Sequence, residues 1–139
     1  MAKILLVDDD RTTLQSLSHT LSGEGYLVEE AQDGAQAVRL IDEERFDLVL
    51  TDIRMPKIDG FGVLDHVRSS APDTPLIMMT GDPTVARIDA LSRGATDCLL
   101  KPLELEQLMR RVEEVLSERN STPFHSRHFQ ANRKPNSVR

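Results

Sequence analysis

The feature that most limits the fold of this chain is a repeated alternation of short apolar runs with amphipathic segments. One such pair recurs about every 20 to 25 residues, and the turns between the segments are rich in Gly, Asp and Pro. Strands that alternate with helices in this way form βα units, in which each helix connects two parallel strands. The sequence therefore predicts an α/β protein with one parallel sheet.

Five apolar runs are predicted to be strands, at residues 3–8, 27–31, 48–52, 76–80 and 98–101. The first, third and fourth are almost wholly apolar, as expected of parallel strands covered on both faces. The second and fifth are less apolar, so we expect them near the edges of the sheet. Apolar residues at helical spacing predict five helices, near residues 14–21, 37–41, 61–69, 84–93 and 105–116.

The length of 139 residues suits a single domain. No apolar run approaches the roughly 20 residues of a membrane span, and no signal region begins the chain, so we expect neither membrane insertion nor secretion. The single cysteine, Cys98, cannot form an internal disulfide, which agrees with a reducing bacterial cytoplasm.

Charge divides the chain into an acidic body and a basic end. Residues 1–117 carry a net charge of −10 and residues 118–139 carry +4, so the body is not expected to bind nucleic acid. We predict one domain over residues 1–118 and, over 119–139, a disordered basic tail, a linker or a remnant of cloning. His125 and His128 lack cysteine or acidic neighbours, so no metal site is expected there.

The polar residues with the greatest chemical interest stand where the predicted strands end. Asp8 and Asp9 end the first strand, Asp52 the third, Thr80 the fourth and Lys101 the fifth. Ligands of doubly wound sheets bind beyond the carboxyl ends of the strands, so we expect these side chains to form one site.

Three carboxylates at one sheet edge repel each other unless a cation is bound, although each aspartate taken singly would cap a helix. An all-oxygen ligand set suits Mg²⁺, with Mn²⁺ as an alternative ion. Lys101 and Thr80 supply a charge and a hydroxyl for a phosphoryl group, and an aspartate oxygen is a competent acceptor for it.

Four segments, "ILLVDDD", "DLVLTDIRMPKIDG", "PLIMMTG" and "GATDCLLKP", occur in an order and spacing that closely resemble the receiver domain of two-component response regulators. The resemblance covers residues 2 to about 118. It implies a flavodoxin-like, doubly wound, five-stranded parallel sheet of strand order 2-1-3-4-5 with five helices, as in chemotaxis receivers.

The resemblance also implies a role for each matching residue. Asp52 would be the phosphoacceptor, and Asp8, Asp9, Asp52 and the backbone carbonyl of Arg54 would hold the metal. Thr80 and Lys101 would bind the phosphoryl group and switch with it, and the Lys101–Pro102 peptide bond would be cis.

Two positions need separate comment. The family commonly has Tyr or Phe three residues before the lysine, but this chain has Cys98, so coupling through a moving ring is not expected. Arg54 and Asp82 match positions that flank the acceptor, and an opposite-charge pair there would modulate the lifetime of the phosphoryl group. The alternative is two solvated loop charges.

As a whole, the resemblance implies a signalling switch that takes part in its own phosphorylation and dephosphorylation, and not a turnover enzyme. The donor would be a sensor histidine kinase or a His-phosphotransfer protein. The fourth helix, fifth strand and fifth helix would form the surface for an output domain, a partner protein or a second copy of the chain.

Two other interpretations stay open. "VDDDRT" also fits the first motif of haloacid-dehalogenase-like phosphatases, with Asp8 as nucleophile and Asp10 as general acid, but that family needs a later acidic pair and leaves "DIRMPKIDG" unexplained. A pseudo-receiver would keep the fold without being phosphorylated. Within a receiver, we expect Asp10 to cap the following helix.

Overall fold

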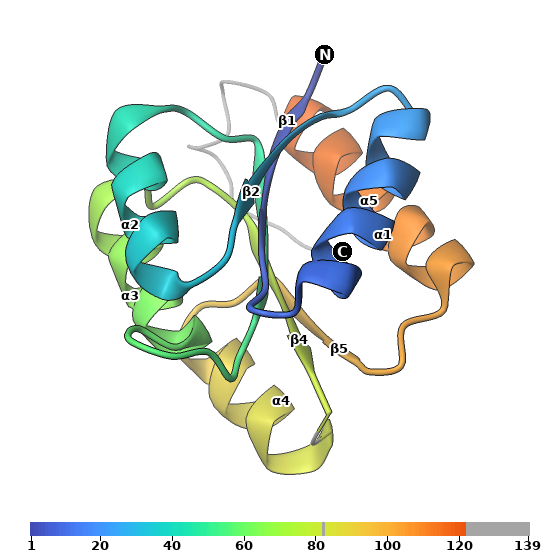
Figure 1. The fold of residues 1–139 in the computed structure, drawn as a ribbon. Coiled ribbons are helices and arrows are strands. Elements are labelled where there is room, and N and C mark those ends of the chain that lie inside the picture. The colour runs from blue at the N-terminus through green and yellow to red at the C-terminus, as the bar shows by residue number, and fades with distance from the viewer. Residues whose placement is uncertain (82, 122–139) are drawn as a thin grey trace.

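The computed structural model describes residues 1–81 and 83–121, which form alternating strands and helices around one sheet (Figure 1). The strands are β1 (Lys3–Val7), β2 (Leu27–Ala31), β3 (Leu48–Asp52), β4 (Leu76–Thr80) and β5 (Asp97–Leu100). The helices are α1 (Arg11–Gly23), α2 (Gly34–Glu43), α3 (Gly60–Ser70), α4 (Pro83–Ser92) and α5 (Leu105–Ser121).

The five strands form one parallel sheet in the order β2-β1-β3-β4-β5. This is the flavodoxin-like order that the resemblance implied, and the prediction of β2 and β5 as edge strands is confirmed. The order reverses at β1, since β2 lies on one side of it and β3 on the other. The carboxyl ends of β1 and β3 therefore meet at the point where such folds bind ligands.

Helices cover both faces of the sheet (Figure 1). On one face α1 and α5 pack through a stripe of aliphatic side chains, which are Leu14, Leu17, Leu21, Leu108, Val112, Val115 and Leu116. On the other face α2, α3 and α4 pack through Ala37, Val63, Leu64, Val67 and Ala90. β1, β3 and β4 are buried between the two layers, which explains why their sequences are almost wholly apolar.

Aspartates begin three of the helices. Asp10, Asp33 and Asp59 are the N-caps of α1, α2 and α3, and each carboxylate accepts a hydrogen bond from a backbone N–H of the first turn. The capping role predicted for Asp10 is confirmed. After α1, Gly25 adopts a φ of 95°, a left-handed conformation that glycine adopts without strain.

The predicted elements are right in number and type, but some of their ends differ. β1 ends at Val7, one residue before the prediction, and β5 covers Asp97–Leu100 instead of 98–101. α5 continues to Ser121, so the predicted boundary between residues 118 and 119 falls inside this helix. The apolar pattern stops near Leu116, but a helix can extend beyond it when its last turn is exposed, as Ser117 and Glu118 are.

Residues 122–139, where most of the predicted tail falls, lie outside the described residues. In the part of the chain that the structure describes, no helix is both long and apolar enough to cross a membrane.

Candidate functional site

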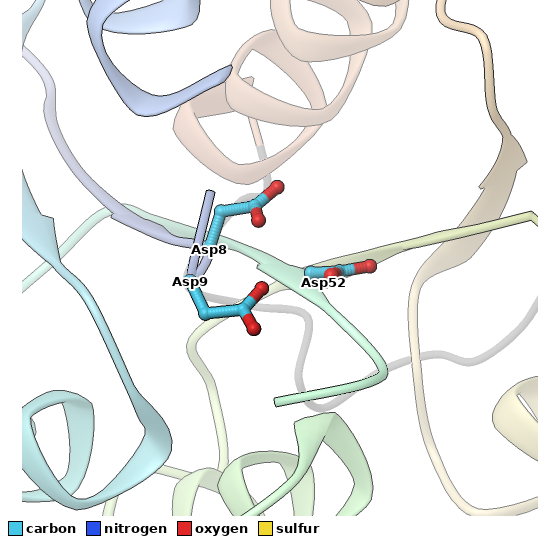
Figure 2. Close-up of side chains that lie close together, drawn as sticks. All are labelled: Asp8, Asp9 and Asp52. Atoms are coloured by element: carbon cyan, nitrogen blue, oxygen red, sulfur yellow. The ribbon is translucent and has the colours of Figure 1, made fainter. Parts of the chain in front are cut away.

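Three carboxylates meet where β1 and β3 end. Asp8 and Asp9 follow β1, and Asp52 is the last residue of β3. One carboxylate oxygen from each of the three lies within 4.8 Å of the other two. Figure 2 shows the three side chains close together at this edge of the sheet. Asp8 is buried, Asp52 is half-buried and Asp9 is exposed. The predicted acidic cluster is therefore present at the predicted edge of the sheet.

Backbone hydrogen bonds hold Asp8 in place. Its own N–H donates to the Ala31 carbonyl across the β1–β2 pair at 3.1 Å. The N–H of Asp10 donates to the Asp8 carboxylate at 2.9 Å. The Asp10 carboxylate instead accepts from the Thr12 N–H and the Thr13 hydroxyl at 3.0 and 2.9 Å. Asp8 and Asp10 thus have different roles: the Asp8 carboxylate is part of the acidic cluster, whereas the Asp10 carboxylate caps α1.

Lys101 brings the positive charge of this cluster. Its Nζ lies 3.1 Å from Asp8 Oδ2 and 3.4 Å from Asp52 Oδ1. Its backbone N–H donates to the Thr80 carbonyl at 2.7 Å, and the Lys101–Pro102 peptide bond is cis. Burial alone would lower the pKa of Lys101, but the hydrogen bond to Asp8 and the charge of Asp52 raise it above its ordinary value.

Asp52 is in an environment that disfavours its negative charge. Burial raises the pKa of Asp52, the Lys101 ammonium opposes this, and the neighbouring Asp8 carboxylate raises it further, so that the net shift is upward. With three carboxylates and one ammonium, the cluster carries an excess of negative charge. Carboxylate oxygens without thiolate or imidazole are the ligands that Mg²⁺ prefers, so these residues fit that ion.

Gly60 packs directly behind Asp52. A Cβ at this position would lie 2.4 Å from the Asp52 carbonyl oxygen, and the Gly60 N–H donates to the Ile53 carbonyl at 2.7 Å. Gly34 packs in the same way against Ile58, where an added Cβ would lie 1.9 Å from the carbonyl oxygen. These close contacts fix the segment that follows the acceptor, a role that the sequence did not indicate for either glycine.

Comparison with known families decides what kind of site this is. The family model described as the response regulator receiver domain matches residues 4–113. The chain belongs to the response regulator receiver family. It is a receiver domain of a two-component response regulator, and the phosphatase and pseudo-receiver interpretations are not favoured.

Relatives of this receiver domain agree in sequence and in fold. Response regulator MprA of Mycolicibacterium vanbaalenii is 43% identical over 122 residues, which cover 87% of this chain and 52% of the relative. The chain therefore spans about half the length of the curated relatives that it matches.

Among solved structures, a CheY-like receiver domain protein of Methanospirillum hungatei is similar with a TM-score of 0.84 and 31% identity, covering 88% of this chain and 99% of that one. Chemotaxis regulator CheY4 of Vibrio cholerae is similar with a TM-score of 0.77 and 37% identity, covering 83% and 98%.

The remaining predicted site residues of the receiver domain differ in burial and in their position on the sheet. Thr80 is the buried last residue of β4, one position beyond the register partner of Asp52. Cys98 is a buried residue of β5, and Arg54 is exposed two residues after Asp52. Asp82 lies outside the described residues, so its pairing with Arg54 stays a prediction.

Proposed function

We propose that Asp52 of this receiver accepts a phosphoryl group from a phosphohistidine of a sensor histidine kinase or a His-phosphotransfer protein. The observation that carries the proposal is the convergence of Asp8, Asp9 and Asp52 around the Lys101 ammonium. One acceptor, two further carboxylates for a cation, and one lysine are the groups that transfer to an aspartate requires.

In the proposed step, an Asp52 carboxylate oxygen forms a bond to phosphorus while the bond from phosphorus to the donor imidazole nitrogen breaks. The imidazole leaves with the electron pair of that bond and takes up a proton. Lys101 stays close to Asp52 and is placed to balance the charge of the phosphoryl oxygens. Hydrolysis of the acyl phosphate by water returns the Asp52 carboxylate.

Asp8, Asp9, Asp52 and the backbone carbonyl of Arg54 are the groups that would hold Mg²⁺, or Mn²⁺ in its place. The bound ion would offset the repulsion between the incoming phosphoryl group and the carboxylates. Asp8 is preset for this role because its carboxylate is positioned by the Asp10 N–H and Lys101. Arg54 is exposed beside the acceptor and would also slow the attack of water on the acyl phosphate.

The outcome of phosphorylation would be a shift between two states of the domain and not continued turnover. Thr80 and Lys101 would move with the phosphoryl group and alter the surface of α4, β5 and α5. We propose that this surface binds an output domain, a partner protein or a second copy of the chain, in the cytoplasm and without direct contact of the receiver to nucleic acid.

The test is phosphorylation of the full chain by acetyl phosphate with Mg²⁺, measured by intact mass. We expect the wild-type chain to gain one phosphoryl group and Asp52→Asn to gain none, because an amide is not a nucleophile for phosphorus. Asp73→Asn, which changes an exposed aspartate of the loop before β4, is the matched control and should label normally.

Two results would contradict the proposal. Labelling of Asp52→Asn at the wild-type level would place the acceptor elsewhere, with Asp8 as the first candidate. A wild-type chain that neither takes up label nor responds to beryllofluoride with Mg²⁺ would behave as a pseudo-receiver.

A further inference from the structure

The described side chains of α4, those of residues 87–92, are mostly exposed. Among its described side chains only Ala90 is buried, while Ile88 and Leu91 are 67% and 40% exposed. By comparison, α1 buries three leucines against the sheet. Within residues 87–92, Ala90 is thus the one side chain buried against the sheet, and the polar contacts of this part of α4 add to what holds it in place.

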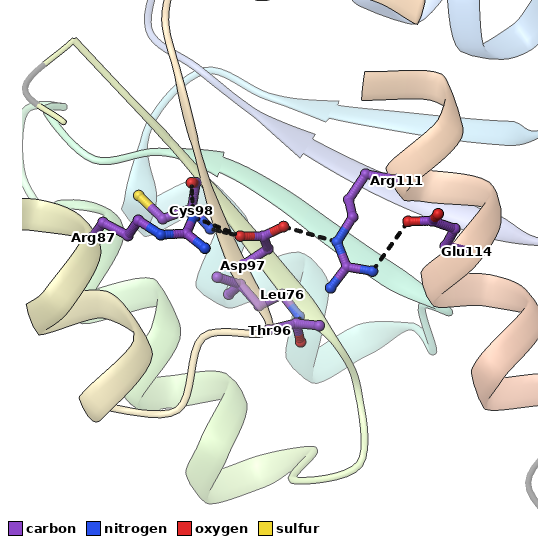
Figure 3. Close-up of polar contacts among 7 residues, drawn as sticks. All are labelled: Leu76, Arg87, Thr96, Asp97, Cys98, Arg111 and Glu114. Atoms are coloured by element: carbon purple, nitrogen blue, oxygen red, sulfur yellow. Dashed lines mark hydrogen bonds and ion pairs between the residues drawn. The ribbon is translucent and has the colours of Figure 1, made fainter. Parts of the chain in front are cut away.

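One carboxylate connects α4, β5 and α5, as Figure 3 shows. Asp97, the first residue of β5, accepts hydrogen bonds from Arg87 of α4 and from Arg111 of α5, both at 2.8 Å. Its Oδ1 also accepts from the Cys98 N–H at 2.7 Å. Arg87 donates a second bond, at 2.7 Å, to the Cys98 carbonyl. The Arg87 guanidinium therefore ties α4 to both the backbone and a side chain of β5.

The other end of α4 is tied to a different element. Just after the helix, the Arg93 guanidinium bonds to Asp65 of α3 at 2.9 Å and lies 4.3 Å from the centre of the Phe61 ring. Arg68 of α3 donates to the Gly94 carbonyl at 2.9 Å. Contacts with α3 thus anchor the carboxyl-terminal end of α4, while Arg87 fastens the helix to β5.

One pocket connects the contacts of Arg87 to Thr80. Thr80, Arg87, Asp97 and Cys98 line one open pocket of about 310 Å³. The backbone of Thr80 is in turn bonded to Lys101, whose Nζ lies beside Asp52. A displacement of Thr80 toward a phosphoryl group would therefore reshape a pocket that Arg87 also lines.

We propose that Arg87 is a positioning residue for the switch: its bonds to Asp97 and to the Cys98 carbonyl latch α4 onto β5 in the unphosphorylated chain. Phosphorylation opens this latch, while the contacts of Arg93 and Arg68 keep the other end of α4 on α3. The inference rests on the proposed function, because it assigns a restraint to the switch that Asp52 controls. A contact present in only one of two states favours that state, so removing it shifts the population to the other.

The test compares Arg87→Ala with the wild-type full chain in two measurements. The first is titration with beryllofluoride at constant Mg²⁺, followed by NMR at a concentration where sedimentation shows monomers. Loss of a half-exposed ion pair should lower the half-saturating concentration roughly threefold. Arg87→Lys should give an intermediate value, since an ammonium can reach Asp97 but lacks the geometry to serve both acceptors.

The second measurement is amide hydrogen exchange of α4 without Mg²⁺ or beryllofluoride. Arg87→Ala should accelerate exchange in residues 87–92, because the latch restrains α4 before any phosphoryl group binds. Arg110→Ala is the matched control. It removes the same charge from an exposed position of α5 that has no hydrogen bond or ion pair within the described residues, and it should leave both measurements unchanged.

Three other outcomes would contradict either the latch or the proposed function. Unchanged beryllofluoride affinity or unchanged exchange in Arg87→Ala would overturn the latch. Weaker affinity, together with loss of a wild-type dimer at higher concentration, would overturn it in favour of a role for Arg87 between copies. If the wild-type chain itself fails to respond to beryllofluoride, the proposed function fails, and the exchange measurement alone decides whether the restraint exists.

Discussion

The acidic cluster and the Arg87–Asp97–Arg111 network each surround an aspartate of the sheet, Asp52 and Asp97, but their charge balance differs. In the cluster, three carboxylates face one ammonium. In the network, two guanidinium groups face the Asp97 carboxylate, and Arg111 also pairs with Glu114. The first arrangement is left with excess negative charge and is suited to a cation, whereas the second is satisfied by the protein alone.

The two central aspartates show the consequence. Burial opposes the ionisation of both, but hydrogen bonds from Arg111, the Cys98 N–H and Arg87 outweigh it at Asp97, so its pKa lies below the ordinary value. At Asp52 the lysine is shared with Asp8, burial prevails, and the pKa lies above the ordinary value. The number and sign of neighbouring groups, more than burial, separate a ligand site from a structural network.

Removal of Lys101 should cause the largest loss of stability, because it increases the excess negative charge of the acidic cluster. Lys101→Met leaves the buried Asp8 carboxylate without its cation, so we expect a loss of about 3 kcal/mol in the free energy of unfolding without Mg²⁺. Mg²⁺ should stabilise the variant more than it stabilises the wild type, because the ion would replace the missing charge.

Urea denaturation with and without Mg²⁺ measures both effects of this substitution. Lys57→Met, which changes a lysine whose side chain is 66% exposed, is the control and should lose less than about 1 kcal/mol. An equal loss in the two variants would mean that Lys101 does not neutralise the cluster.

Substitution of Gly60, which packs against the backbone of Asp52, should cause the next largest loss of stability. Gly60→Ala would place a Cβ against the Asp52 carbonyl, so we expect a loss of about 2 kcal/mol and a displaced acceptor with weaker beryllofluoride binding. Gly23→Ala adds the same methyl group where no atom lies within 4 Å, and it should be neutral or slightly stabilising. Thermal unfolding and beryllofluoride titration of the two variants test this. If Gly60→Ala has the stability and the beryllofluoride affinity of the wild type, the backbone around Asp52 can shift to accommodate the added methyl group.

The smallest loss of stability is expected from substitution of Asp97 in the Arg87–Asp97–Arg111 network, and this loss should depend on pH. Because the pKa of Asp97 is lower in the folded chain than in the unfolded one, its stabilisation is present above the ordinary aspartate pKa of about 3.9 and is lost as the pH falls through the folded value. Asp97→Asn should therefore be about 1 kcal/mol less stable than the wild type at pH 7. The difference should shrink as the solution is acidified below pH 4.

Urea denaturation over a pH series measures this difference, with Asp89→Asn on the exposed side of α4 as the control. A difference between Asp97→Asn and the wild type that stays constant down to the acid limit would mean that the charge of Asp97 is not what stabilises the network.

Much of the fold and of the cluster could be predicted because the relevant signals are local. A buried parallel strand requires a continuous apolar run, and the residue after that run necessarily lies at the carboxyl edge of the sheet. The sequence therefore predicts that Asp8, Asp52, Thr80 and Lys101 lie at one edge of the sheet. The strand order came from the resemblance, since the apolar pattern does not specify which strands are neighbours.

By itself, the sequence determined the five βα units, the edge and central strands and the edge of the sheet at which acid and lysine side chains meet. These follow from hydrophobic burial and strand direction, which act along the chain. Only the tertiary structure decided that Lys101 bonds to Asp8 beside Asp52, that Gly60 supports the acceptor, and that Asp97 joins α4 to α5. Those contacts connect residues up to 93 positions apart, and their geometry depends on how the layers pack and not on any local pattern.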